Sequence, residues 1–419
     1  MTVAQKSNKR KIINDPVYGF ININNDLIFD LIEHPWFQRL RRIRQLGLTY
    51  LVYPGSVHTR FQHALGAAYL MDQAINVIRS KGHEITDAEA EAVTIAILLH
   101  DVGHGPFSHA LEYSLIEYHT HENISELIMD ELNKQFNGRL SLAIDIFKNK
   151  YHKKFLHQLV SGQLDMDRLD YLKRDSFFTG VTEGGVGSDR IIKMLSVAKD
   201  NLVLEAKGIY SIEQFLIARR LMYWQVYLHK TVLSAETLLV NSLKRSKKLA
   251  LEGQELFATP ALQFFLTQKF KKDDLSPSKP ELRSQILENF VMLDDTDIVA
   301  ATKVWQNHSD KVLSMLCRNM TNRILYKIEM QNNPFSKERM DELKNKSKSL
   351  LGLSDNEVEY FVFSDTIINH TYVPSDNRIS ILFKNGNITD ISEASDILDI
   401  SVLSKVVKKY FLCYPRELK

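Results

Sequence analysis

Apolar residues recur at helical spacing along most of this chain, and few glycines or prolines interrupt them. The 419 residues include 17 glycines and 10 prolines. Apolar side chains that return every three to four residues form one face of a helix, which must be buried against other elements. The pattern therefore favours a mainly α-helical fold. Helices are expected over residues 27–46 with a break at Pro35, 64–79 with Gly82 as the C-terminal cap, 87–99, from Phe107 onward, 156–177 and 211–245.

The pattern changes after about residue 355, where short alternating segments indicate strands. Asn385–Gly386 between two of these segments is typical of a tight hairpin turn. The charged stretch 270–281, with two prolines, is the best candidate for an exposed connection. We predict a helical core over 1–270, a helical extension over 271–354 and a small α+β region over 355–419. The expected strands lie at 359–365, 379–383, 388–391 and 408–414.

Composition excludes several classes of protein. Lys plus Arg is 53 and Asp plus Glu is 51, which argues against a dedicated nucleic-acid binder. Two cysteines, Cys317 and Cys413, rule out a disulfide scaffold and suit a reducing compartment. The apolar run 92–99 is too short to cross a bilayer, and the basic N-terminus lacks the apolar stretch of a secretory signal. A cytoplasmic location without membrane contact is therefore expected.

Histidines are concentrated in one part of the chain. Eight of the 14 lie between His58 and His121, and histidine is the commonest metal ligand and the usual acid or base near neutral pH. Within this window, His100–Asp101 follows a strongly apolar stretch and offers the mixed nitrogen and oxygen ligands that a divalent cation binds. Taken alone, such a pair is more often a helix-terminal aspartate beside a buried structural histidine.

The segments around this pair strengthen the chemical interpretation. Residues 60–63 (RFQH) precede it, and residues 103–109 (GHGPFSH) follow it. Farther along, Asp167, Tyr171 and Asp175 are spaced by four residues, which places them on one helix face. That face read by itself is also compatible with an ordinary solvated helix surface.

Taken together, these motifs resemble the HD superfamily of metal phosphohydrolases, whose pattern is a His, a His–Asp pair and a distant Asp. The chain is most similar to the deoxynucleoside triphosphate (dNTP) triphosphohydrolase branch, which includes bacterial dGTPases and the SAM-and-HD-domain enzyme of vertebrates. Similarity is weaker at 227–230 and 322–327. The matching stretches are NDPVYG (14–19), FQRLRRIRQLG (37–47), YPGSVHTRFQH (53–63), LLHDVGHGPFSH (98–109), HE (121–122) and DMDRLDYLKRD (165–175).

The resemblance implies a metal centre and a reaction. It makes the core over 1–270 an HD phosphohydrolase domain with His63, His100, Asp101 and Asp167 as metal ligands. The ion would be Mn, Fe, Mg or Zn, since all accept such ligands. The family cuts dNTPs between the 5′ oxygen and the α-phosphorus and releases a deoxynucleoside and triphosphate. Its bacterial members favour dGTP as the substrate.

Further roles are carried over from the same resemblance. Arg60, Arg168 and Arg219 are expected to bind the triphosphate, and Lys230 to help close the pocket. Glu112 stands where the family more often has Asp, and Arg168 where it often has Lys. Tyr171 would lie beneath the deoxyribose and exclude a 2′ hydroxyl, and Gln45 and Asp175 would bind the 3′ hydroxyl. His109, Glu112 and His121 are the expected catalytic residues, His104 would contact the α-phosphate, and Leu46 and Tyr227 complete the substrate-binding set.

Regulation by nucleotides is the last expectation from the resemblance. The vertebrate enzyme binds activating nucleotides between subunits, and a homotetramer is expected here too. Glu33 replaces an Asp of that enzyme, and the SAM domain is absent. The alternative is that Arg39, Arg41, Arg42 and Arg44 form a solvated basic helix face. The matching positions are Lys11, Asn14, Glu33, Gln38, Arg41, Arg323 and Lys327.

Two rival functions stay open. One is an HD phosphohydrolase of another specificity, such as a nucleotide monophosphatase or a cyclic-nucleotide phosphodiesterase. The deoxyribose set of Gln45, Tyr171 and Asp175 argues against it. The other is a non-catalytic nucleotide sensor or single-stranded nucleic-acid binder, which the intact ligand set and the balanced charge disfavour.

Overall fold

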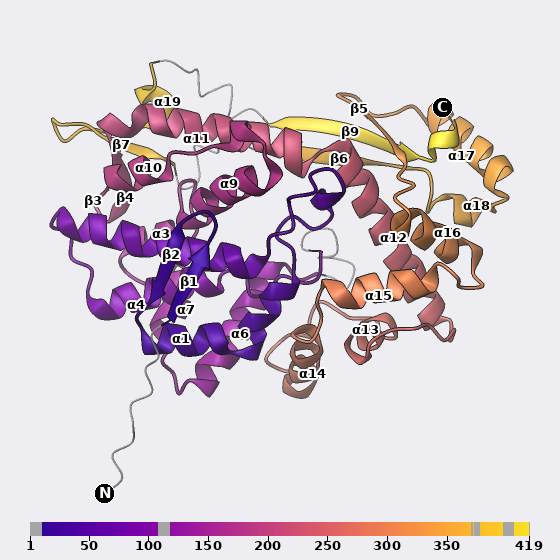
Figure 1. Cartoon of the computed structure of the whole chain (residues 1–419), viewed down its shortest axis with the longest axis horizontal. Helices are drawn as coiled ribbons and strands as arrows, with labels where there is room; N and C mark the ends of the chain where they lie inside the picture. The colour runs from indigo at the N-terminus through magenta and orange to yellow at the C-terminus, as the bar shows by residue number, and fades with distance from the viewer. Residues whose placement is uncertain (1–10, 108–117, 370–371, 373–377, 397–405, 419) are drawn as a thin grey trace, which may run out of the picture.

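The computed structural model describes residues 11–107, 118–369, 372, 378–396 and 406–418. Helices dominate this part of the chain (Figure 1), and the predicted mainly α-helical class is confirmed. None of the described helices is both long and apolar enough to cross a bilayer. The longer helices are α1 (Asp26–Glu33), α3 (Arg60–Ser80), α4 (Asp87–Leu99), α6 (His121–Gln135), α9 (Met166–Thr179), α11 (Ile209–Met222), α12 (Lys230–Leu251), α14 (Pro280–Phe290), α15 (Asp295–Trp305), α16 (Lys311–Thr321) and α17 (Lys337–Leu351).

Short helices connect and flank these elements. Helix α2 is followed directly by a 3₁₀ turn at Arg39–Arg42, and a π-helical turn at Tyr223–Tyr227 lies between α11 and α12. The short α-helices are α2 (Pro35–Gln38), α7 (Ser141–Phe147), α8 (Lys154–Val160), α10 (Ser188–Met194), α13 (Pro260–Leu266), α18 (Asp355–Val358) and α19 (Ile391–Ala394).

Helix α3 organises the half of the molecule that contains the N-terminal strands. It packs against both α4 and α9, because the buried small residues Ala64, Gly66 and Ala67 let neighbouring backbones approach closely. Helix α4 is apolar on nearly every side and lies in the core. These contacts bring together the start of α3, the end of α4 and the start of α9. The motifs identified in the sequence lie at those three places.

Two predicted helices are interrupted in the structure. The expected helix over 156–177 is split into α8 and α9, because the Asp165 side chain caps α9 by accepting the amide of Arg168 at 2.7 Å and that of Gly162 at 2.8 Å. The expected helix over 211–245 is split by the π-helical turn, and the His229 side chain caps α12 through the amide of Thr231 at 3.1 Å.

The helix predicted after Pro35 is also shorter than expected. Regular helix ends at Arg42, and Arg44 instead forms a β-bridge with Thr59. The amide of Gln45 then donates to the carbonyl of His58 at 3.0 Å. Two other boundaries agree with the sequence: Gly82 follows α3 with a left-handed φ of 85°, and α4 spans 87–99.

Three small sheets complete the fold. Strands β1 (Lys11–Asp15) and β2 (Gly19–Ile23) form an antiparallel hairpin. A second sheet has the order β3-β4-β7-β8, from β3 (Leu195–Ala198), β4 (Asn201–Glu205), β7 (Ser380–Leu382) and β8 (Ile388–Asp390). The third has the antiparallel order β5-β9-β6, from β5 (Lys327–Gln331), β9 (Val407–Tyr414) and β6 (Phe363–Asn369).

The C-terminal strands do not form a sheet of their own. Strand β7 pairs in parallel with β4, and β9 pairs with β5, so each sheet joins strands distant in sequence. The predicted hairpin is present, with Gly386 at φ 84°, and β9 matches the predicted strand at 408–414. Strand β6 begins only at Phe363, because the residues between α18 and this position form turns. The domain boundaries at 270 and 354 stay predictions.

Candidate active site

Three helix ends position the four side chains of the predicted ligand set. His63 lies in the first turn of α3, whose start is set by a capping box between Thr59 and Gln62. His100 is the C-cap of α4 and Asp101 follows it. Asp167 lies in the first turn of α9, directly after the cap at Asp165. Each residue therefore has a helix terminus that fixes its backbone.

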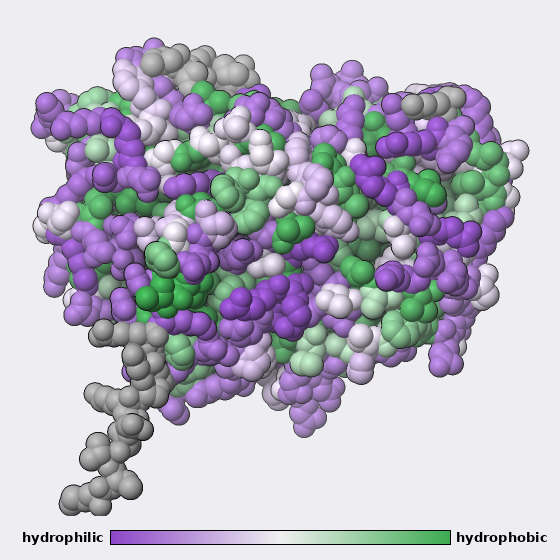
Figure 2. Space-filling view, viewed as in Figure 1, coloured by the Kyte–Doolittle hydropathy of each residue, from purple (hydrophilic) through white to green (hydrophobic). Residues whose placement is uncertain are grey.

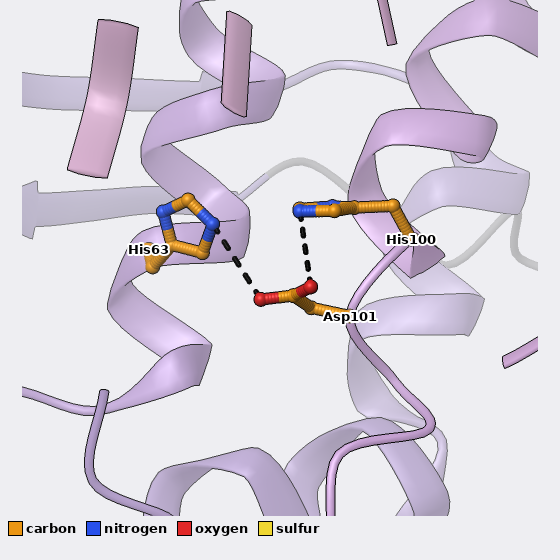
Figure 3. Close-up of side chains that lie close together, drawn as sticks. All are labelled: His63, His100 and Asp101. Atoms are coloured by element: carbon orange, nitrogen blue, oxygen red, sulfur yellow. Dashed lines mark ion pairs between the residues drawn. The ribbon is translucent and has the colours of Figure 1, made fainter. Parts of the chain in front are cut away.

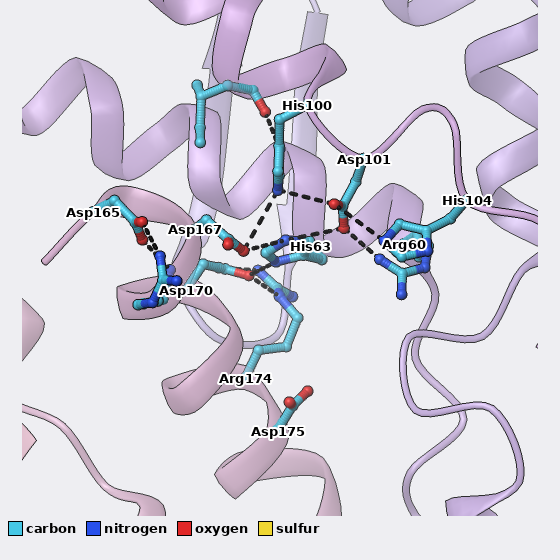
Figure 4. A network of polar contacts seen from close by, with 12 residues as sticks. Arg60, His63, His100, Asp101, His104, Asp165, Asp167, Asp170, Arg174 and Asp175 are labelled. Atoms are coloured by element: carbon cyan, nitrogen blue, oxygen red, sulfur yellow. Dashed lines mark hydrogen bonds and ion pairs between the residues drawn. The ribbon is translucent and has the colours of Figure 1, made fainter. Parts of the chain in front are cut away.

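The four side chains converge on one small volume (Figure 4), and Figure 3 shows three of them, His63, His100 and Asp101, from close by. The Asp167 Oδ1 atom lies 3.1 Å from Nε2 of His63 and 3.4 Å from Nε2 of His100. Asp101 contributes both oxygens: Oδ1 lies 3.3 Å from Nε2 of His100, and Oδ2 lies 3.7 Å from Nε2 of His63. Both histidines are buried. The structure thus brings together the residues that the sequence motifs grouped.

This donor set fits a divalent cation. Nε2 of His63 and Nε2 of His100 are buried and have no hydrogen-bond partner within the described residues. Both nitrogens face carboxylate oxygens, and the ligand atoms of His63, His100 and Asp101 lie within 4.8 Å of one another. Two imidazoles and two carboxylates are a common ligand set for Mn, Fe or Zn. When bound, such an ion would polarise a phosphoryl oxygen and activate water.

The neighbouring carboxylates change the protonation of the two histidines. Burial alone would lower the pKa of His63, but the carboxylates of Asp167 and Asp170 raise it to about 10. Against the same burial effect, Asp101 and Asp167 raise the pKa of His100. Although burial opposes it, the two imidazoles hold the pKa of Asp167 far below its ordinary value. A bound cation would replace these protons, since metal ligands must be deprotonated.

Arg60, His104 and His121 form a second group beside the first. The Arg60 guanidinium pairs with Oδ2 of Asp101, and Nε2 of His104 lies 3.4 Å from Oδ1 of the same carboxylate. The His104 and His121 rings stack with centroids 3.9 Å apart. Burial, followed by the charge of Arg60, holds the pKa of His104 well below its usual range. A permanent cation beside the neutral His104 ring suits an anionic ligand better than a second metal ion.

The expected catalytic pair His109 and Glu112 lies outside the described residues. His121, the third expected catalytic residue, is the first residue of α6 and lies next to His104. Asp101 belongs to both groups: its carboxylate lies close to His63 and His100 on one side and to His104 and His121 on the other.

The residues expected to bind the sugar come from α9, from the loop before α3 and from the π-helical turn after α11. Asp175 is buried and both of its oxygens are engaged: Nε2 of His58 lies 2.7 Å from Oδ1, and the Tyr227 hydroxyl donates to Oδ2 at 2.8 Å. The Tyr171 ring lies 6.2 Å from that of Tyr227. Oε1 of Gln45 is buried without a hydrogen-bond partner in the described part of the chain. Leu46, next in the loop, packs against the core.

The other two expected triphosphate ligands have partners at the start of α9. The Arg168 guanidinium pairs with the carboxylate of Asp165. Nη1 of Arg219 donates to Oε1 of Gln163 at 3.2 Å. Lys230, the first residue of α12, is exposed. Arg168 and Arg219 would therefore need to exchange their present partners, or to accept an additional partner, in order to bind phosphate.

The expected regulatory residues fall into two pairs and three separate positions. Lys11 pairs with Glu33, and Nε of Arg41 donates to Oε1 of Gln38 at 2.8 Å. The remaining three residues have other partners within the chain. Asn14 pairs with Phe20 in the hairpin, the Arg323 guanidinium donates to the carbonyl of Leu51 at 2.9 and 3.1 Å, and Lys327 opens β5 opposite Tyr414.

Sequence reasoning missed several residues that line this site from behind. Asp170 contacts Nδ1 of His63 at 2.7 Å, Arg174 pairs with Asp170, and His58 contacts Asp175. Asp170 and Arg174 are spaced by four residues, as are Asp167, Tyr171 and Asp175. The same periodicity argument, applied to the adjacent face of α9, could have identified Asp170 and Arg174.

Comparison with known proteins agrees with this geometry. Residues 60–175 match the HD domain family, and residues 186–263 match the HD associated region. The uncharacterized protein YwfO of Bacillus subtilis is 32% identical over 99% of this chain and 94% of its own length. The deoxynucleoside triphosphate triphosphohydrolase SAMHD1 homolog of Dictyostelium discoideum is 32% identical over 55% of this chain and 48% of its own length.

A solved structure covers nearly the whole chain. The crystal structure of a phosphohydrolase from Bacteroides thetaiotaomicron is 57% identical, has a TM-score of 0.93, and matches over 97% of this chain and 100% of that one. The HD domain match spans both the start of α3 and the end of the α9 motif, so it includes all four converging side chains. The chain therefore belongs to the HD-domain family of metal-dependent phosphohydrolases.

Proposed function

We propose that this protein is a metal-dependent dNTP triphosphohydrolase that converts a dNTP, with dGTP favoured, to a deoxynucleoside and inorganic triphosphate. The observation that carries the proposal is the convergence of His63, His100, Asp101 and Asp167 beside the buried Arg60. Support for the substrate class comes from relatives of about 30% identity whose names specify dNTP hydrolysis.

Arg60 would bind the phosphate chain at its reactive end. Its guanidinium is buried and already lies against the Asp101 carboxylate, so it is held next to the cation site at little further entropic cost. A planar guanidinium also binds phosphate oxygens through two parallel hydrogen bonds. Arg168 and Arg219 would bind the distal phosphates, and His104, kept neutral by its surroundings, would donate a hydrogen bond to the α-phosphate.

The proposed reaction breaks the bond between the α-phosphorus and the 5′ oxygen. Water supplies the new oxygen on the released triphosphate, and the departing 5′ oxygen takes a proton to become a hydroxyl. We assign this proton transfer to His109, with Glu112 orienting its ring and His121 assisting, as the family resemblance implies, since histidine is the usual general acid or base near neutral pH. Exchange of His109 for Ala should therefore reduce turnover far more than it weakens dNTP binding.

The sugar would be read by the polar residues around Asp175. The 3′ hydroxyl would bind Gln45, whose Oε1 is buried without a partner in the described residues, and Asp175. Tyr171, Leu46 and Tyr227 would enclose the deoxyribose. A site that leaves polar groups unsatisfied when a hydroxyl is missing discriminates strongly, so dideoxy analogues should be poor substrates.

The test is product analysis in the presence of Mn²⁺ with each of the four dNTPs and four NTPs, and with nucleoside monophosphates and cyclic nucleotides as alternative substrates. We expect deoxynucleoside and triphosphate from dNTPs, resolved by ion-exchange chromatography, and no reaction of NTPs. The matched control is Asp167→Asn, which preserves the shape of the side chain. Orthophosphate from monophosphates, or ring opening of a cyclic nucleotide, would instead identify a phosphohydrolase of another specificity. Nucleotide binding without turnover would identify a sensor.

Assembly and activation are a separate part of the proposal. The hairpin exposes Ile12 and Phe20, each with about two thirds of its surface accessible (66% and 67%), on the face that also carries Asn14, and an apolar patch lies there in Figure 2. We propose that nucleotides binding near Lys11 and Asn14 favour a homotetramer. Mass photometry with and without dGTP tests this: a mass that never exceeds the monomer contradicts it.

A further inference from the structure

The ring nitrogen of His63 that faces away from the cation site has its own buried partner. Nδ1 of His63 lies 2.7 Å from Oδ2 of Asp170, and both side chains are fully buried. Asp170 lies three residues after Asp167 on α9. One helix therefore contacts both nitrogens of the same imidazole, one through each carboxylate.

Asp170 is held in place by a two-pronged pair with Arg174 (Figure 4). Nε of Arg174 donates to Oδ2 of Asp170 at 2.9 Å, and Nη2 donates to Oδ1 at 3.0 Å. The other edge of the guanidinium binds Asp15, with Nη1 2.7 Å from Oδ2 and Nη2 3.3 Å from Oδ1. The Arg174 side chain has no exposed surface. One buried cation thus connects two carboxylates that are 155 residues apart in sequence.

Asp15 belongs to the turn of the N-terminal hairpin. Its Oδ1 accepts the amides of Val17 and Tyr18, each at 3.0 Å, so the carboxylate organises the turn as well as binding Arg174. The Tyr18 ring packs against Tyr69 of α3, with centroids 5.0 Å apart, and lies 5.5 Å from the Arg174 guanidinium. The hairpin turn is therefore docked on both α3 and α9.

Helix α3 leaves room for this network at Gly66, one turn after His63. A Cβ atom at Gly66 would lie 2.0 Å from Oδ1 of Asp170 and 2.2 Å from Nη2 of Arg174. Any side chain at this position would push the carboxylate and the guanidinium away from α3. The space that the pair occupies is thus a specific feature of the helix surface.

We propose that Asp170 and Arg174, anchored by Asp15, are positioning residues that fix the His63 ring for metal binding. The N-terminal hairpin is then a structural part of the metal centre. A carboxylate on Nδ1 selects the tautomer that would leave Nε2 free as a ligand, and it fixes the orientation of the ring. The proposal rests on the metal centre of the proposed function and is independent of the substrate.

The test measures Mn²⁺ binding by isothermal titration calorimetry on the full chain. Asp170→Asn keeps the size of the side chain but loses the charge-assisted bonds, and it should weaken Mn²⁺ binding by roughly 10- to 100-fold. Asp15→Asn acts through one further residue, so its effect should be smaller, below about 10-fold. A loss of Mn²⁺ affinity that is larger for Asp170→Asn than for Asp15→Asn is the result expected if these residues act by positioning the His63 ring.

The matched control is Asp310→Asn. Asp310 caps α16 by accepting the amide of Leu313, and it forms a two-pronged pair with an arginine, Arg245, whose Nε donates to it at 3.0 Å. Both side chains of that pair are about nine-tenths buried. The control should lower the melting temperature in the manner of Asp15→Asn but leave the Kd for Mn²⁺ unchanged. A general loss of stability is thereby separated from a loss of ligand geometry.

The outcomes are distinct. Wild-type Mn²⁺ affinity in Asp170→Asn would overturn the proposal, and wild-type affinity in Asp15→Asn would overturn the role of the hairpin. If Asp15→Asn does not fold, Arg174→Lys replaces it, with Co²⁺ absorption as the readout: an unchanged visible spectrum would overturn the proposal. A different result is that the wild type binds Mn²⁺, the variants weaken this binding as expected, and the protein hydrolyses no dNTP. That result would reject the proposed function and leave this inference intact.

Discussion

The half of the molecule around α3, α4 and α9 and the helical region from α12 to α16, a larger extension than the one predicted over 271–354, are stabilised in different ways. The first buries a dense set of charged and polar side chains. In the described part of the second, the large buried side chains are mostly apolar, Trp305 and Phe265 among them, and Arg245–Asp310 is the one ion pair between α12 and the start of α16. The buried polar residues of the first half include Asp15, Arg39, His58, Arg60, His63, His100, Asp101, His104, Asp165, Asp170, Arg174 and Asp175.

This contrast separates function from stability. Desolvating a charge costs several kcal/mol, and even a good partner often does no more than offset that cost. A cluster of buried charges is therefore a poor way to stabilise a fold and a good way to hold ligands in fixed geometry. The extension gains its stability from apolar burial, at roughly 25 cal/mol per Å².

The two regions are nevertheless joined at the loop that follows α4. The buried Arg39 donates to the carbonyls of Val102 and His104 at 2.9 Å and to that of Leu293 at 3.0 Å. Asp295, at the start of α15, accepts the amide of Phe107 at 2.8 Å. The extension thus supports the loop that carries His104.

The largest expected effect is in the first half. Asp101→Ala removes a ligand and the partner of Arg60, and it should lower turnover by roughly 10³-fold or more, equivalent to the several kcal/mol that a metal ion supplies. Triphosphate release and Mn²⁺ content are the measurements. Full turnover in this variant would remove the basis for the contrast between the two regions.

The reverse pattern is expected in the extension. Leu316 is fully buried on α16, and Leu316→Ala should reduce the free energy of unfolding by about 2–5 kcal/mol through loss of apolar contact and a residual cavity. Turnover per folded molecule should not change. Urea unfolding followed by circular dichroism gives the first quantity, and a fall in kcat of the folded fraction would contradict the separation.

A half-buried acid in α12 gives the extension a pH dependence of its own. Burial raises the pKa of Glu236 to about 7, above its ordinary value of 4.5. The folded state then binds more protons than the unfolded state between these values, so stability should fall as pH rises from 4.5 to 7, by roughly 2 kcal/mol. Glu236→Gln should flatten the curve of melting temperature against pH. An unchanged curve would show that this carboxyl is solvated.

The smallest effect is expected for surface charges of the first half. Lys134 and Glu131 on α6 form an exposed pair at 2.7 Å. Lys134→Ala should change the free energy of unfolding by less than about 1 kcal/mol, because water screens exposed pairs. Mn²⁺ affinity and turnover should equal those of the wild type. A large loss of Mn²⁺ affinity or of turnover would mean that exposed charges in this half contribute to the site as much as buried ones do.

Much of the fold and the centre of the site were predictable from local signals. Helical periodicity identified α3, α4 and most of α9, and Asn385–Gly386 identified the turn between β7 and β8. Periodicity could not locate the breaks at Asp165 and His229, because each depends on a side chain that caps the next helix in competition with continuing the previous one. The pairing of β4 with β7 has no local signal at all.

The sequence by itself determined which residues could hold a cation: His63, His100, Asp101 and Asp167 carry suitable ligands at recognisable spacings. The tertiary structure alone decided what stands behind them. Asp15 meets Arg174, and Arg39 meets the carbonyl of Leu293. Such contacts depend on how helices pack, and packing is a collective result of the whole buried surface, which short-range spacing in the chain does not encode.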